Sequence, residues 1–281
     1  RVHGWRLPDA CNFQTVIAME QSAYGVAKQY GVKPWSDEHY RLMEPSFKLM
    51  AQVGNKWLFI PVLHYTEFGN HTDGMIKWII KKDGSFDFDL SKLDRYISFA
   101  QKYWVKIPII CFVVNHGTSS HSKMRVTVHK EGGGTEEYDL GATNPDREKA
   151  WKAFSTTIYT YMQEKGLEDS LNWGFGWDGI GDAAMIPMLE KFVPEVKRWS
   201  SGCHAGNRLP GYANVFAFSS IYGIRIDESS RSGWKNPKYA LTNPRAGSSV
   251  ISANGHSPSF PYRLLPERAL AVGYRGVGRI G

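Results

Sequence analysis

Residues 172–182, NWGFGWDGIGD, combine glycines, aromatic rings and two carboxylates. Asp178 ends an apolar run directly after Trp177, and the glycines on both sides of it would let a backbone or a ligand come close. An Asp in this position can also cap a helix, form a turn or pair with a cation. Asp182 is better placed to cap the helix expected to follow, which leaves Asp178 available for chemistry. The stretch therefore indicates a hydrolytic site, for which a second carboxylate is usually needed.

Polar and aromatic side chains follow the other expected strands as well. Because the carboxyl ends of parallel strands meet on one face of a barrel, these side chains could share a cleft there. Aromatic rings favour a sugar ligand, since flat rings stack on the apolar faces of sugars. The alternative is that the strands simply lead into polar loops. The residues are Glu20 and Gln21, His64, Tyr65 and Glu67, Asn115 and His116, Trp177 and Asp178, His204, and Ser219, Ser220 and Tyr222.

Other kinds of site find little support in the sequence. His64 and His116 lack the HxH, HExxH or carboxylate spacing of a metal site, so a hydrogen bond to substrate or packing within a loop is favoured. No Gly-x-Ser-x-Gly elbow and no GxxxxGKS/T loop is present. Cys11, Cys111 and Cys203 lie far apart, and Cys111 is expected to pack as a small hydrophobe. We therefore expect no metal and no organic cofactor.

The 281 residues carry a net charge of +7. The basic residues are spread out, without a block of about five or six, so nucleic-acid binding is not indicated, although an anionic glycan would suit the charge. No apolar run approaches the roughly 18 residues of a membrane span. The chain starts at Arg1 without a signal peptide and is expected to be trimmed from a longer one. We expect a secreted or periplasmic location, which the sequence itself does not show, and it does not indicate the oligomeric state.

Short β-rich runs alternate with helical stretches along the chain, which is typical of parallel βαβ units. About eight such units predict a single (β/α)8 barrel of class α/β over residues 1–281, with a β-hairpin insertion after the third strand. A doubly wound sheet is the alternative, but the GxxxxGKS/T phosphate loop is missing. Ser36 is expected to cap a helix and Ser91 to open another, while Asp83 and Gly84 are expected to turn a hairpin. The expected strands are 13–20, 56–65, 106–114, 171–178, 195–202, 214–220 and one at the C-terminus, the helices are 36–54, 91–104, 146–166, 183–193 and one before the last strand, and the hairpins are 75–90 and 123–141.

Four stretches carry a resemblance to a known family. They are residues 21–40, QSAYGVAKQYGVKPWSDEHY; residues 83–104, DGSFDFDLSKLDRYISFAQKYW; residues 154–170, FSTTIYTYMQEKGLEDS; and residues 173–198, WGFGWDGIGDAAMIPMLEKFVPEVKR. In their order and spacing they resemble the catalytic domain of glycoside hydrolase family 123 and related uncharacterised domains. The resemblance implies a (β/α)8 barrel that cleaves β-linked N-acetylgalactosamine from glycans. It also implies that the substrate's acetamido oxygen attacks the anomeric carbon, that an Asp orients the acetamido nitrogen, and that the adjacent Glu acts as acid and base.

The family's Asp–Glu pair is only half present in this chain. Matched by position, the Asp falls on Asp178, while the Glu falls on Gly179, which cannot transfer a proton. General acid catalysis is worth about 10²–10⁴ in rate, so an active hydrolase needs another residue in that role. A cleft can place a second carboxyl about 5–10 Å from Asp178. The candidates, in order of preference, are Glu20, Asp182 and Glu67, with His116 and His204 as weaker options.

We expect a glycoside hydrolase that acts on a polysaccharide or glycan, with Asp178 as stabiliser or base and a relocated general acid. Gly179 motivates a second hypothesis, a carbohydrate-binding barrel that has lost its activity. A third hypothesis is a lyase acting on uronic sugars through His and Tyr, which would need an Arg or Lys to neutralise the uronate. Arg208, Arg225 and Arg231 lie in expected late loops. The residues expected to contact substrate are Trp177, Gln21, His64, Tyr65, Asn115, His116, His204 and Tyr222.

Overall fold

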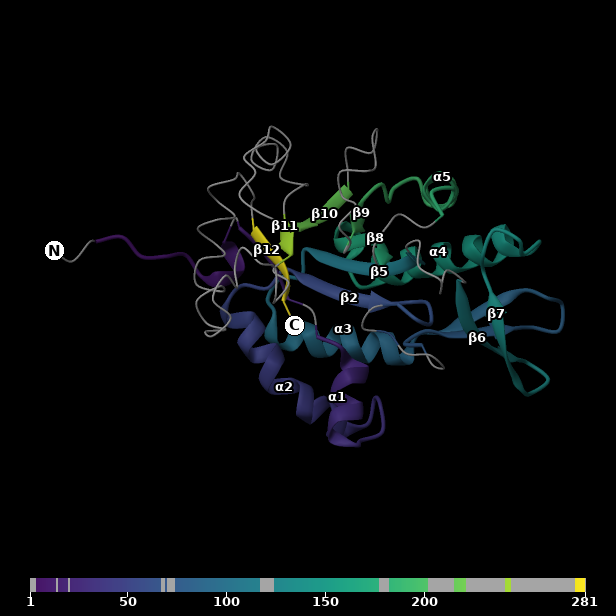
Figure 1. Cartoon of the computed structure of the whole chain (residues 1–281), viewed down its shortest axis with the longest axis horizontal. Coiled ribbons are helices and arrows are strands. Elements are labelled where there is room, and N and C mark those ends of the chain that lie inside the picture. The colour runs from purple at the N-terminus through teal and green to yellow at the C-terminus, as the bar shows by residue number, and fades with distance from the viewer. Residues whose placement is uncertain are drawn as a thin grey trace.

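The computed structural model of the chain is drawn in Figure 1, where coloured ribbons mark the part that is described below. Most of this part lies in the first two hundred residues. Within it, no helix is both long enough and apolar enough to cross a membrane. The described residues are 4–13, 15–19, 21–66, 69, 74–116, 124–176, 182–201, 215–220, 241–243 and 276–280.

Eight strands form one sheet, and all of their pairings are parallel. Their order, β1-β12-β11-β10-β9-β8-β5-β2, follows the chain and pairs the first strand with the last. The predicted α/β class and parallel sheet are therefore confirmed. The strands are β1 (Val16–Met19), β2 (Trp57–Pro61), β5 (Ile109–His116), β8 (Leu171–Gly176), β9 (Trp199–Ser201), β10 (Val215–Ser220), β11 (Leu241–Asn243) and β12 (Gly276–Ile280).

The remaining seam of the sheet, between β1 and β2, is held by few contacts. An isolated parallel bridge joins Ile17 to Asn55, just before β2. The backbone N–H of Lys56 donates to the carbonyl of Ile17 at 2.9 Å, and the N–H of Met19 donates to Asn55 Oδ1 at 2.7 Å. No longer ladder connects these two strands in the described ranges, so a fully closed barrel stays a prediction.

Helices follow several of the strands, and their starts are encoded locally. Ser36 caps α2 as predicted, because its Oγ accepts the N–H of His39 at 3.3 Å. Ser91 opens α3 by position but does not cap it: the N–H of Ser91 donates to Asp89 Oδ1 at 2.9 Å. Helix α1 was not expected from the sequence and ends at Gly31, which has a φ of 63°. The helices are α1 (Ala23–Tyr30), α2 (Asp37–Gln52), α3 (Ser91–Tyr103), α4 (Arg147–Glu164) and α5 (Met185–Phe192), with short 3-10 turns η1 (Ala10–Asn12) and η2 (Glu168–Ser170).

Two hairpins build a second, smaller sheet. The predicted insertion after the third strand is confirmed as β6 (Arg125–Lys130) and β7 (Thr135–Asp139), which are antiparallel. A further hairpin, β3 (Lys77–Ile80) and β4 (Phe86–Asp89), follows β2 and turns at Gly84, as predicted. Strands β3 and β6 pair in parallel, so the two insertions form one sheet of order β4-β3-β6-β7.

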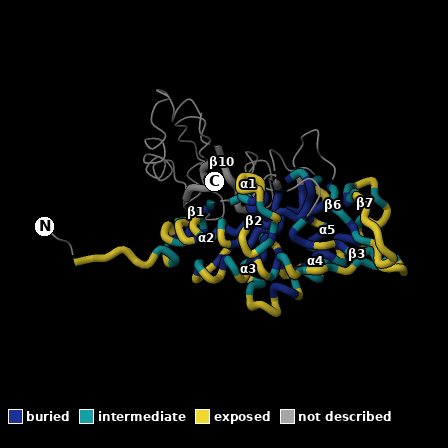
Figure 2. Tube along the Cα trace, turned by 90° about the horizontal axis from the view of Figure 1, so that it is seen from below, coloured by how far each residue is buried: buried dark blue, intermediate teal, exposed yellow. Residues whose placement is uncertain are grey.

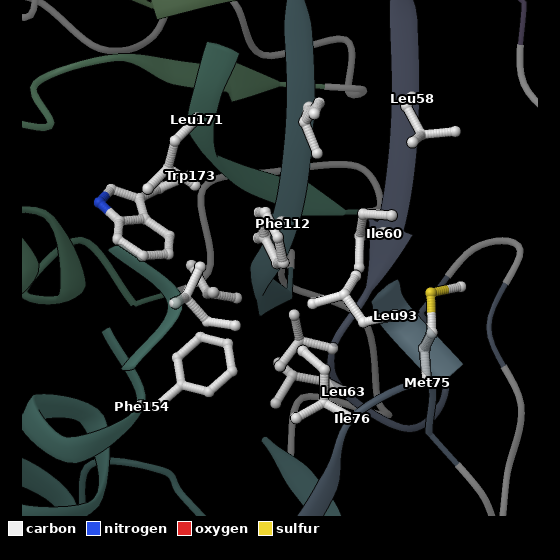
Figure 3. Packing of buried hydrophobic residues seen from close by; sticks show 14 of the residues in the cluster. Leu58, Ile60, Leu63, Met75, Ile76, Leu93, Phe112, Phe154, Leu171 and Trp173 are labelled. Carbon is white, nitrogen blue, oxygen red and sulfur yellow. The ribbon is translucent and has the colours of Figure 1, made fainter. Parts of the chain in front are cut away.

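The residues of the main sheet alternate between two sides. One side, called the helix side below, packs against the helices in a large cluster that includes Phe112, Trp173 and, from α4, Phe154 (Figure 3). The other side, called the inner side, holds a separate small cluster that joins β1, β2 and β5. Figure 2 shows that buried segments, in dark blue, gather in the middle of the described part. The inner cluster consists of Ala18, Trp57, Phe59, Ile109, Cys111 and Val113, which confirms the expected packing of Cys111.

Candidate active site

The neighbouring ends of β5 and β8 are where the sequence predicted the reactive carboxylate. A β-bulge follows Val113 on β5. Beyond the bulge, Asn115 lies opposite Phe175, which packs on the helix side, and His116 lies opposite Gly176. In a regular strand Asn115 would share the inner side with Val113, because side chains alternate. The bulge therefore turns Asn115 toward the helix side. Bulges next to active sites often change the direction of a side chain in this way.

The side chain of Asn115 holds the backbone of Asp182 from two directions. Its Nδ2 donates to the carbonyl of Asp182 at 2.7 Å, and its Oδ1 accepts the N–H of Asp182 at 3.2 Å. Asn115 is 0% exposed, and these bonds satisfy both polar groups of its buried amide. Asp182 is thereby held against the end of β5. A direct contact of Asn115 with substrate stays a prediction.

The carboxylate of Asp182 is engaged by protein groups as well. Its Oδ1 accepts the N–H of Ala184 at 2.9 Å, and its Oδ2 forms an ion pair with the guanidinium of Arg147. The carbonyl of Asp182 accepts the N–H of Met185 at 3.2 Å. The expectation that Asp182 caps α5 therefore needs correction, since Ala184 occupies the cap position and Asp182 instead forms the turn before it. With both oxygens bound in this way, Asp182 is poorly arranged to donate a proton to a sugar.

At the end of β2, His64 connects the main sheet to the small sheet. The side chain is buried, and its Nε2 lies 3.1 Å from Thr127 Oγ1 of β6. Its backbone N–H donates to the carbonyl of Arg125 at 2.8 Å. The next residue, Tyr65, has a φ of 59°, which is uncommon for a residue other than Gly and is seen preferentially at functional sites. His64 thus has a structural partner, and contacts of His64 and Tyr65 with substrate stay predictions.

At the end of β1, Gln21 lies beside a small pocket. Its Nε2 donates to Ser46 Oγ at 2.6 Å, while its buried Oε1 has no hydrogen-bond partner within the described part. The pocket has room for about one water molecule and not for a sugar ring. A water bound there would satisfy Oε1. The pocket is lined by Gln21, Ala23, Tyr24, Phe59, Pro61, Met75 and Tyr96.

On the inner side, β8 and β9 carry small and polar residues. A Cβ added to Gly174 would lie 2.4 Å from Cys111 Sγ, so the close approach of β8 to β5 requires glycine there. Asn172 donates to the carbonyl of Ser170 at 2.9 Å and accepts the hydroxyl of Ser200 at 3.3 Å. Among the described residues, no group of three or more His, Cys, Asp and Glu could hold a metal ion.

Comparison with known proteins supplies the family. The sequence model described as the catalytic domain of glycoside hydrolase 123 matches residues 21–228. The chain belongs to the glycoside hydrolase 123 family. A comparison with curated proteins gave no match.

One solved structure of the same family shares the fold of this chain. A family 123 glycoside hydrolase from Clostridium perfringens, whose structure was analysed for glycolipid glycan hydrolysis, superposes with a TM-score of 0.75 at 17% identity. The match covers 98% of this chain and 50% of that one, so the chain spans about half the length of that relative. A rutinosidase from Aspergillus niger, covering 85% of this chain and 80% of its own at 10% identity, reaches a TM-score of only 0.39, too low to support an argument.

Several predicted site residues of this family 123 domain lie outside the described residues. Gly176, the last residue of β8, is described, whereas the segment 177–181 that follows it is not. Of His116 only the backbone is described. The distance between Asp178 and a second carboxyl therefore stays a prediction. The residues outside are Trp177, Asp178, Gly179, Glu20, Glu67, His204 and Tyr222, together with Arg208, Arg225 and Arg231.

The structure also adds a residue that the sequence analysis did not select. Arg147 begins α4 and pairs with Asp182, which was selected only as a carboxylate. In the sequence, Arg147 stands out only as a cation in the first turn of a helix, where it opposes the helix dipole. The family's motif did not point to it, since the motif concerns the segment after β8.

Proposed function

We propose that the chain is the catalytic domain of a glycoside hydrolase that cleaves a glycosidic bond in a polysaccharide or glycan. The match of the family 123 catalytic domain to residues 21–228 carries this proposal. The strand order and the Ile17–Asn55 bridge support a closed (β/α)8 barrel as its scaffold. In such a barrel the ends of β5 and β8 belong to the face that carries catalytic residues.

Asp178 is the proposed stabiliser or base, and its carboxylate belongs to the segment directly after β8. A β-linked N-acetylhexosamine is the first substrate to test, because the family's Asp orients an acetamido group. The general acid must come from elsewhere, since Gly179 has no acidic group. Glu20 and Glu67 are favoured over Asp182, because Arg147 and Ala184 engage both oxygens of Asp182.

The substitution Asp178→Asn tests the proposed role of the carboxylate. We expect hydrolysis of 4-nitrophenyl N-acetyl-β-D-galactosaminide to fall by about 10²–10³-fold, the usual effect of losing one group that stabilises developing charge. Asp169→Asn is the matched control, because Asp169 is fully exposed in the turn before β8 and should leave the rate unchanged. Equal rates for Asp178→Asn and the native chain would show that Asp178 is not the reactive carboxylate.

The relocated acid is tested by comparing leaving groups. Nitrophenolate departs without protonation, whereas a sugar alkoxide must be protonated by an acid. Glu20→Gln should therefore slow the hydrolysis of a natural disaccharide by about 10²–10⁴-fold and that of the nitrophenyl glycoside much less. Glu67→Gln is tested in parallel, and the exposed Glu164 gives the control Glu164→Gln. If neither substitution distinguishes the two leaving groups, neither residue is the acid.

The products separate the other hypotheses from hydrolysis. New reducing ends indicate a hydrolase, and an unsaturated end that absorbs in the ultraviolet indicates a lyase. A chain that retains glycans on an affinity column while forming neither product is a binding module, the hypothesis that Gly179 motivates.

A further inference from the structure

The loop 31–36, which joins α1 to α2, holds a tryptophan in an unusual backbone conformation. Trp35 has a φ of 66°, and its side chain is buried. A bulky residue rarely adopts this left-handed conformation, which persists where the surrounding structure holds it. Two side chains hold the backbone of Trp35: Nδ1 of His39 accepts its N–H at 2.9 Å, and Nη1 of Arg95 donates to its carbonyl at 3.3 Å. The conformation of the loop thus depends on these two hydrogen bonds.

His39 forms both of its hydrogen bonds as a neutral ring. Because Nδ1 accepts the N–H of Trp35, the ring proton must be on Nε2, which donates to the carbonyl of Ala23 at 2.7 Å. The side chain is 0% exposed, and burial lowers its pKa below 6.5. A second proton, on Nδ1, would turn the acceptor into a donor that faces the N–H of Trp35. The bond to Trp35 is then lost, whereas the bond to Ala23 remains.

The groups around His39 oppose a positive charge on its ring. Arg95 lies 4.1 Å from the ring centre of Tyr40, the neighbour of His39, and its partner Asp37 is 96% exposed, so solvent weakens the influence of that carboxylate. No described carboxylate pairs with His39. A proton on His39 is therefore stabilised when the ring reaches water. In the described part, the titratable groups that contact the rings of His39 and Trp35 are the phenols of Tyr24 on α1, Tyr40 on α2 and Tyr96 on α3.

The ring of Trp35 connects this loop to the pocket beside Gln21. It packs edge-on against Tyr24, with ring centres 5.3 Å apart, and against Tyr96, with ring centres 5.8 Å apart. Both tyrosines also line the pocket at the end of β1. Protein interiors are closely packed and transmit strain, so a displacement of Trp35 reaches the wall of this pocket.

We propose that the contact between His39 and Trp35 is a pH-sensitive switch, which keeps the α1–α2 loop closed while His39 is neutral and opens it when His39 takes up a proton. In the open state the imidazole reaches water, and Trp35 leaves both its left-handed conformation and its place against the pocket wall. The open state binds the proton more tightly, because burial opposes the charge in the closed state. Acid therefore favours opening, by up to about tenfold per pH unit between 6.5 and the folded pKa.

The first measurement is amide hydrogen exchange of the whole chain by NMR, from about pH 7.5 to about pH 5, expressed as protection factors because intrinsic exchange itself depends on pH. We expect the protection factor of the Trp35 amide to fall by up to about tenfold per pH unit below 6.5 and to level off below the folded pKa of His39. In His39→Gln, whose amide does not titrate, it should stay constant. The amide of Ile158, buried in α4, is the control for global unfolding and should keep its protection.

The ring nitrogens of His39 provide a test that needs no variant. In the native chain they should show the proton on Nε2 at neutral pH, and His39 should titrate with the same midpoint at which Trp35 loses protection. A proton on Nδ1 at neutral pH, or constant protection of Trp35 while His39 titrates, overturns the proposal. A loss of protection that Ile158 shares also overturns it, because the whole chain would then be unfolding.

The second measurement follows the pocket wall through ring flips of Tyr96, which is only 3% exposed. A buried ring can flip when neighbouring side chains move aside, so each opening of Trp35 should permit flips. We expect flips of Tyr96 to become faster in acid in the native chain and to stay unchanged in His39→Gln. Flips that are independent of pH while Trp35 opens would overturn the connection to the pocket. The switch does not depend on the proposed hydrolase function, so a chain that hydrolyses nothing would overturn that function alone.

Discussion

The helix side and the inner side of the main sheet are built from alternate residues of the same strands, yet they are held in different ways. On the helix side of β8, Trp173 and Phe175 are buried among aromatic rings of neighbouring elements. On its inner side, Asn172 makes hydrogen bonds and Gly174 fits against Cys111. At β8, the helix side is filled by large side chains, whereas on the inner side Gly174 leaves room for Cys111 of β5. Nearer to β2, the inner side is itself packed by the cluster that contains Trp57 and Phe59.

This contrast explains how one strand can serve both stability and a site. The large rings on one side pack β8 into the helix-side cluster, and Gly174 on the other side leaves room for the side chain of Cys111. Substitutions that remove volume should therefore destabilise the helix side of β8, and substitutions that add volume should destabilise its inner side.

The largest effect is expected from deleting volume on the helix side. Trp173→Ala removes a fully buried indole that lies near Phe154 and Phe112, and should lower the free energy of unfolding by about 3–5 kcal/mol. The loss is measured by denaturant unfolding, in which the midpoint should shift while the m-value stays the same. Trp5→Ala, at a position 69% exposed, is the control and should change stability by less than about 0.5 kcal/mol. A loss below about 1 kcal/mol for Trp173→Ala would contradict the assigned packing.

A smaller effect is expected from adding volume on the inner side. Gly174→Ala places a methyl group against Cys111 Sγ and should cost about 1–3 kcal/mol. Gly132→Ala is the control, since nothing lies within 4 Å of the added carbon there. The double variant with Cys111→Ala should recover part of the loss if the clash with sulfur is its cause. Additive losses in this double-mutant cycle would place the strain elsewhere.

The smallest effect is expected from the protonation of His39, a buried residue of α2 that forms hydrogen bonds to the backbone. Buried His39 accepts the N–H of Trp35 at Nδ1 (2.9 Å), and its Nε2 lies 2.7 Å from the carbonyl of Ala23. Burial lowers the pKa of His39 below 6.5, so the unfolded chain takes up the proton at higher pH than the folded one. The stability that neutral His39 provides is therefore present above about pH 6.5 and is lost as the pH falls through the folded pKa.

The comparison of the native chain with His39→Gln isolates this contribution. The difference in unfolding free energy between the two should be largest near pH 7.5 and should shrink as the pH falls through the folded pKa of His39. Other titrating groups are common to both chains and cancel in the difference. A difference that stays constant with pH would mean that His39 does not titrate differently in the folded state.

Much of the fold was predictable because its signals are local. The cap at Ser36 and the turn at Gly84 depend on neighbouring residues. The apolar runs that became β2, β5 and β8 were located as strands, although the expected bounds ran up to four residues past the observed ones. Helix α1 was missed because it is only eight residues long and contains Gly25, a poor helix former. The pairing of β3 with β6 could not be read either, since no local signal specifies which hairpins meet.

The candidate site was predictable in its residue types but not in its contacts. Asn115 and Asp182 were both selected, as a substrate contact and as a catalytic carboxylate, without any sign that they bond to each other. Their partnership depends on the bulge after Val113, which changes the direction of one side chain and leaves no clear pattern in the sequence. Arg147 could not be selected from the sequence, because its ion pair with Asp182 forms only when the starts of α4 and α5 pack together.

The parallel pairing of β3 with β6 has a consequence for how related chains can vary. The two hairpins arise from separate insertions, after β2 and after β5, but each covers the hydrogen-bonding edge of the other. A chain that lost one of them would leave a bare strand open to aggregation with another molecule. Loss of either insertion would therefore expose the edge of β3 or β6, in addition to the edges that β4 and β7 already present.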